Sequence, residues 1–91
     1  MSETTSRLDD VMQRIDADFE GSVDRLCELL RIESVSTDPG HDQQTAACAE
    51  HCARMLEAMG FEAEAVETPG HPMVVAEHAG PTEDAPCILY Y

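Results

Sequence analysis

The stretch Phe61-Glu62-Ala63-Glu64-Ala65-Val66-Glu67 sets apolar residues against acidic ones in near-alternation. Successive side chains of a strand point to opposite faces, so this pattern predicts a β-strand with one buried and one solvated face. A turn with two prolines follows at Thr68–Pro72, and Met73–His78 is predicted to form a second strand. The centre of the chain is therefore expected to be a β-hairpin.

A helix is predicted before this hairpin, over about His41 to Met59. Asp38 and Pro39 fit the N-cap and the first helical position, and Gly60 fits a left-handed residue that ends the helix. The apolar positions that repeat at helical spacing are Ala46, Ala49, Cys52, Ala53, Leu56 and Met59. We expect this side of the helix to pack on the sheet.

A longer amphipathic helix is predicted over about Ser6 to Ile32. Ser6 followed by Asp9 fits a cap at its start, and Gly21 weakens the middle, so a bend is expected there. The apolar residues recur at steps of three and four: Leu8, Val11, Met12, Ile15, Phe19, Val23, Leu26, Leu29, Leu30 and Ile32.

The run Cys87-Ile88-Leu89-Tyr90-Tyr91 is apolar throughout, which is typical of a strand buried on both faces. Such a strand needs neighbours on both edges and a covering layer on both faces. The predicted order is helix, helix, strand, strand, strand, which is too little to cover it. We therefore expect the chain to be the front piece of a larger α/β protein.

Composition excludes two broad classes of function. The 91 residues carry 19 acidic and 5 basic side chains, a net charge of −14. Both nucleic acid and anionic membrane surfaces would repel such a chain. No apolar run approaches the roughly 20 residues needed to span a bilayer, and Met1–Ser6 is unlike a signal peptide. A single domain or part of one, in the cytoplasm and with free thiols, is expected.

Several stretches in order resemble the zinc metallopeptidase family of acetylornithine deacetylase, succinyl-diaminopimelate desuccinylase, bacterial carboxypeptidases and carnosine-type dipeptidases. They are Leu29–Pro39, Met55–Phe61, Val66–Pro72 and Cys87–Tyr91, so the resemblance covers about residues 26–91. The third stretch is most similar to the dipeptidase branch. Many family members have proline at the position of Glu33.

The resemblance implies a three-layer catalytic domain with a mixed sheet, of which residues 1–91 are the N-terminal part. Family members hydrolyse the amide bond of dipeptides or N-acyl amino acids with two divalent metals, usually zinc. They also use a glutamate as general base and a smaller domain that usually forms a homodimer. Their first metal ligand lies in a glycine-histidine-x-aspartate motif, which would begin just past Tyr91. The resemblance thus places no catalytic, metal-binding or cofactor-binding residue in this chain, and implies that the chain alone is inactive.

Other residues suggest chemistry of their own. Metal ligation is suggested by His41, His51, His71, His78, Cys48 and Cys52. Cys48 and Cys52, however, are a helical i, i+4 pair without a second pair at zinc-finger spacing, and packing is the simpler interpretation. Cys27 lies near a helix end, where the helix dipole disfavours a thiolate nucleophile. Ser34 and Ser36 lack a glycine elbow and fit a loop.

Two alternatives remain open at this stage. The chain could be a small acidic interaction module that completes its sheet by pairing with a partner or a second copy. It could also be a remnant protein without function.

Overall fold

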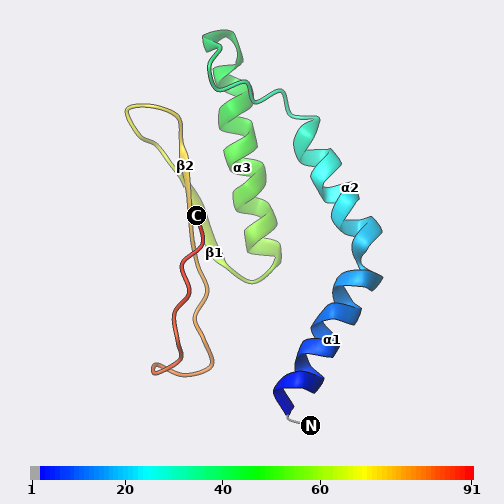
Figure 1. Cartoon of the computed structure of the whole chain (residues 1–91). Coiled ribbons are helices and arrows are strands. Elements are labelled where there is room, and N and C mark those ends of the chain that lie inside the picture. Colours follow the sequence, from blue (N-terminus) through cyan, green and yellow to red (C-terminus); the bar gives the residue numbers. More distant parts are fainter. Residues whose placement is uncertain (1–2) are drawn as a thin grey trace. The chain divides into compact units, whose positions relative to one another are not determined.

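The computed structural model describes residues 3–91, with side chains from Ser6 onward. This part of the chain is mixed α/β, with three α-helices, one 3-10 helix and a two-stranded antiparallel sheet (Figure 1). The elements are α1 (Glu3–Ala17), α2 (Phe19–Leu30), η1 (Pro39–His41), α3 (Asp42–Ala58), β1 (Glu62–Val66) and β2 (Met73–Glu77). The chain divides into two compact units, Met1–Ile32 and Glu33–Tyr91.

The prediction of one helix over Ser6–Ile32 is wrong, because the first unit contains two helices that meet at Asp18. The backbone of Asp18 departs from helical geometry, with φ −99° and ψ 8°. Hydrogen bonds nevertheless run across it: the Asp18 N–H donates to Arg14 O at 3.0 Å, and the Ser22 N–H donates to Asp18 O at 2.9 Å. The junction is therefore a bend in a nearly continuous helix. Because α1 begins at Glu3, Ser6 lies inside the helix and does not cap it.

The bend was expected at Gly21, but it falls three residues earlier, at Asp18. The Asp18 carboxylate accepts a hydrogen bond from Arg25 Nη2 at 2.8 Å, and both side chains are about half exposed. A Cβ atom on Gly21 would lie 2.8 Å from Asp18 Oδ1. Gly21 thus leaves room for the carboxylate to fold over α2, and it contributes to the bend through Asp18.

The second unit is built on the predicted hairpin. Strands β1 and β2 pair antiparallel, with Ala63 opposite Ala76 and Ala65 opposite Val74. These four side chains are half-buried, and α3 contacts both strands. The alternate positions, from Glu62 opposite Glu77 onward, are exposed. The alternation in the sequence therefore predicted the hairpin and its solvated face, which carries three glutamates and three exposed apolar residues: Glu62, Glu64, Glu77, Val66, Met73 and Val75.

Two alanines form the core of this unit. Ala53 is 0% exposed and Ala49 is 9% exposed, and they are the only buried residues among those whose side chains the structure describes. Such small side chains allow α3 to lie close to the hairpin. Cys52 and Leu56 are half-buried beside them, whereas Met59, predicted on the same apolar side, is 61% exposed.

The ends of α3 follow the predicted capping chemistry with small shifts. The Asp38 carboxylate accepts from the Gly40 N–H at 3.0 Å, with Pro39 at the first position, but the capped turn is η1 and α3 begins after it. Gly60 adopts φ +96°. Its N–H donates to Glu57 O at 2.9 Å, and the Phe61 N–H donates to Leu56 O at 3.0 Å, which is a Schellman motif.

The predicted third strand is absent, so this expectation is also wrong. Residues 87–91 form no strand, and the exposed fractions of Ile88, Leu89 and Tyr90 are 71%, 84% and 82%. The C-terminal end runs as an irregular segment in Figure 1. An apolar run becomes a buried strand only where a neighbouring strand and a covering layer exist, and residues 3–91 supply neither. No helix of the described part is long and apolar enough to cross a membrane.

We predict that Ala53→Leu destabilises the second unit by about 1–3 kcal/mol, because three added heavy atoms do not fit between α3 and the hairpin. Ala47→Leu is the matched control, since Ala47 is exposed on the same helix. Urea unfolding followed by circular dichroism measures both variants. Equal stability of the two would contradict the packing of α3 described here.

Candidate functional site

Two loops of the second unit meet through His71. The His71 Nε2–H donates to the backbone oxygen of Ser36 at 2.7 Å, across 35 residues of sequence. This bond places the ring proton on Nε2 and leaves Nδ1 as an acceptor when the ring is neutral. The loop before η1 and the turn between β1 and β2 are thereby joined, and we call this pair of segments (residues 33–38 and 67–72) the loop pair.

The turn that carries His71 is stabilised by Thr68. The Thr68 hydroxyl donates to the His71 backbone oxygen at 2.6 Å and accepts from the Gly70 N–H at 3.1 Å. One side chain therefore fixes both sides of Gly70 and holds the backbone from which the His71 ring reaches Ser36. The predicted turn at Thr68–Pro72 is confirmed, and His71 lies in it.

His41 links the loop pair to the start of α3. Its Nδ1–H donates to Asp38 at 2.8 Å, and its Nε2 lies 3.8 Å from a carboxylate oxygen of Glu33. Asp38 and Glu33 are 52% and 76% exposed, so these contacts contribute little to stability. The arrangement is one imidazole between two solvated carboxylates.

The remaining two histidines lie elsewhere. The His78 Nδ1–H donates to Ala79 O at 2.8 Å, and its ring meets Phe61 edge to face with centroids 5.1 Å apart. His51 is half-buried on α3, and its Nε2 has no hydrogen-bond partner. Within residues 3–91, no three or more His, Cys, Asp or Glu side chains are grouped so that they could hold a metal ion.

The cysteine pair of α3 is a poor nucleophile. Partial burial raises the pKa of the Cys52 thiol, and the neighbouring Cys48 raises it further through charge repulsion and a hydrogen bond. A catalytic cysteine needs the opposite shift. All four cysteines are free thiols in the structure, with Cys87 exposed and Cys27 half-buried in α2.

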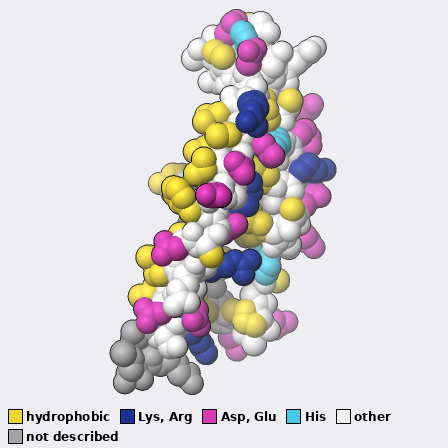
Figure 2. Space-filling model, turned by 90° about the vertical axis from the view of Figure 1, so that its right-hand side faces the viewer, with side chains coloured by type: hydrophobic (Ala, Val, Ile, Leu, Met, Phe, Trp, Pro, Cys, Tyr) yellow, Lys and Arg dark blue, Asp and Glu magenta, His cyan; other side chains and the backbone are white. Residues whose placement is uncertain are grey.

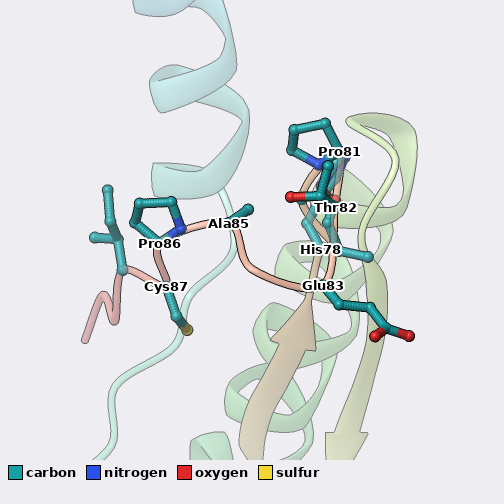
Figure 3. Close-up of a pocket in the computed structure, with 10 residues that line it drawn as sticks. His78, Pro81, Thr82, Glu83, Ala85, Pro86 and Cys87 are labelled. Atoms are coloured by element: carbon teal, nitrogen blue, oxygen red, sulfur yellow. Dashed lines mark hydrogen bonds between the residues drawn. The ribbon is translucent and has the colours of Figure 1, made fainter.

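A hollow of about 650 Å³ lies within the loop that follows β2. It is lined by residues 78–83 and 85–88, most of them small or proline. Figure 3 shows His78 and Glu83 on one side and Pro86 and Cys87 on the other. His78 is already bonded to Ala79, and Glu83 is exposed, so the hollow shows no nucleophile held against a base.

Comparison of the chain with known protein families, with curated proteins and with solved structures finds no match. The candidate site therefore has to be judged from its own geometry. That geometry is a loop pair held together by the hydrogen bond from His71 to Ser36, in which Nδ1 of the neutral His71 ring is left as an acceptor.

Sequence reasoning missed the contact between His71 and Ser36. In the sequence the residues of the loop pair are recognisable only as turn formers. The acceptor of the bond is a backbone oxygen, which every residue type carries, so the sequence does not mark it. Only the resemblance selects both segments, since Leu29–Pro39 and Val66–Pro72 include them.

We predict that His71→Ala loosens the loop pair, because it removes the hydrogen bond to Ser36. The Asp38 N–H, which donates to Val35 O at 3.2 Å, should exchange with solvent up to about tenfold faster. Hydrogen exchange measured at Asp38 tests this. His78→Ala is the control, since the His78 ring bonds to Ala79 and packs on Phe61, both outside the loop pair, and its loss should leave Asp38 unchanged.

We predict that Cys52 is alkylated more slowly than Cys87 below pH 9.0, its reference value, because its raised pKa keeps it a neutral thiol. Because folding favours the neutral Cys52 thiol, its contribution to the free energy of unfolding is present below the reference pKa of 9.0. This contribution is lost as the pH rises through the higher pKa that Cys52 has in the folded chain. Cys48→Ala should lower the pKa of Cys52 only part of the way, because burial is the larger cause. Alkylation rates resolved by peptide mass spectrometry over a pH series measure each effect. A Cys52 profile identical to that of Cys87 would contradict the burial.

Proposed function

We propose that this chain is the N-terminal scaffold of the catalytic domain of a metal-dependent dipeptidase or amidohydrolase. The parent enzyme would hydrolyse the amide bond of dipeptides or of N-acyl amino acids, and it would act as a homodimer. The proposal derives from the resemblance of residues 26–91 to the metallopeptidase family.

The loop pair is the observation that supports the proposal most. Two of the four stretches that carry the resemblance are far apart in sequence, yet the bond from His71 to Ser36 joins them at 2.7 Å. Of the other two stretches, Met55–Phe61 covers the end of α3 and Cys87–Tyr91 follows β2, and both lie in the second unit. Apart from Leu29–Ile32, which belongs to the first unit, the segments that resemble one catalytic domain in sequence thus belong to one compact unit.

The residues described here do not fit a two-metal site. No group of three or more potential ligands is present among them. His41 lies beside two carboxylates, those of Asp38 and Glu33, and both are exposed. The proposal assigns the metal ligands and the general base to residues after Tyr91, and it assigns no catalytic step to this chain. Its role is to position the segment Cys87–Tyr91 ahead of the first ligand.

The cytoplasm is the proposed compartment. Disulfides persist in oxidising compartments and are rare in the cytosol. All four cysteines are free thiols in the structure, and Cys87 is exposed, so the chain is compatible with a reducing environment.

One observation favours the alternative of an acidic interaction module. The apolar segment Cys87–Tyr91 is exposed, and the sheet has two strands in the described part of the chain. A partner that adds a strand to this sheet would bury the segment. The module would then act through its own surface, and no hydrolytic activity would be associated with it.

The two functions are separated by assaying the chain alone and the chain extended by the codons that follow Tyr91 in its own DNA. With Zn²⁺ added, the extended chain should hydrolyse a dipeptide or an N-acetyl amino acid, whereas residues 1–91 should not. The reason is that the described residues lack a group of metal ligands.

The controls use the loop pair. In the extended chain His71→Ala should reduce activity, and His78→Ala should reduce it less, because only His71 joins the two resembling segments. Hydrolysis by residues 1–91 alone, or an extended and folded chain that hydrolyses neither substrate, would refute the proposal.

A further inference from the structure

Seven apolar side chains of the first unit are 41–70% exposed and follow a repeat of 11 residues. Leu8, Phe19 and Leu30 are 11 residues apart, as are Met12 and Val23, and Ile15 and Leu26. Eleven residues make three helical turns, so such a repeat keeps its members on one side of a helix. We call the set the seam: Leu8, Met12, Ile15, Phe19, Val23, Leu26 and Leu30.

The seam crosses the bend without interruption. The hydrogen bonds at Asp18 carry the helical backbone from α1 into α2, so the repeat keeps its phase across the junction. Figure 2 shows hydrophobic side chains that follow one another along one flank, with acidic side chains beside them. Exposed apolar rows of this length mark sites of association.

The spacing of the seam is the same in both directions. Its steps are four, three, four residues before Phe19 and four, three, four after it. If a second copy lies antiparallel with its Phe19 opposite Phe19, Leu8 faces Leu30 of the second copy, and Ile15 faces Val23 of the second copy. Every member then meets another apolar side chain, which is the self-complementarity that a two-fold interface requires.

Charge also favours the antiparallel orientation. Asp9 and Arg31 follow Leu8 and Leu30 directly, so they flank the seam on the same side. In the antiparallel pair, Arg31 of one copy lies near Asp9 of the other at both ends. In a parallel pair these two residues would be 22 positions apart, about 33 Å along the helix, and could not meet.

We propose that a second copy of this chain covers the seam, so that two chains associate through α1 and α2 in antiparallel orientation. The proposed function does not use most of this surface, because the family resemblance begins at about Leu26. The association can therefore be correct whether or not the proposed function is. Since each chain carries a net charge of −14, salt should strengthen the association.

The oligomeric state of the full chain tests the proposal. Sedimentation equilibrium over a micromolar concentration series should show a monomer–dimer equilibrium. Phe19→Asp should weaken it about 100-fold or more, because Phe19 lies at the two-fold axis and is buried against its own copy. Ala17→Asp adds the same charge to an exposed position of α1 that neither belongs to the seam nor directly follows one of its residues, and it should change the equilibrium little.

The orientation is tested by exchanging charges. Asp9→Arg and Arg31→Asp should each weaken the dimer, and the double variant should restore it, because the two positions meet only in the antiparallel pair. Circular dichroism of each variant checks that the helices remain folded, so that a loss of dimer reports on the seam.

Three results would overturn the proposal. The first is a wild-type chain that stays monomeric at high salt. The second is a dimer that Phe19→Asp leaves intact while Leu89→Asp dissociates it, since Leu89 lies in the exposed C-terminal segment and not in the seam. The third is a double charge variant that is no stronger than the two single variants.

Discussion

The close approach of α3 to the hairpin is the constraint on which the second unit depends. Ala53 and Ala49 are the buried residues of α3, and a larger side chain at either position would separate the two layers. With α3 fixed, the loop before it and the turn between the strands lie near enough for His71 to reach Ser36 at 2.7 Å. The candidate site is therefore a consequence of packing between two alanines and a two-stranded sheet.

Local chemistry made much of this unit predictable. The alternation in Phe61–Glu67, the Asp38–Pro39 cap and the left-handed Gly60 each act within a few residues, and each appears in the structure close to where it was expected. The bend at Asp18 was misplaced because it arises from a side chain that folds over Gly21 to reach Arg25. That contact spans seven residues and has no periodic signal.

Features that depend on distant partners could not be predicted in the same way. Cys87–Tyr91 has the composition of a buried strand, yet composition does not supply the neighbour that a strand needs. The contact of His71 with a backbone oxygen is equally invisible in the sequence. Both features become intelligible together if residues beyond Tyr91 complete the sheet and the site, which is the central claim of the proposed function.

The most direct measurement is to sequence the parent DNA past Tyr91. The account predicts a glycine-histidine-x-aspartate motif immediately after the apolar segment Cys87–Tyr91, so that the first metal ligand follows the segment this chain positions. A stop codon at that point, or a continuation without histidine and acidic residues, would contradict the account. In that case the exposed segment Cys87–Tyr91 would have to be explained by a partner chain.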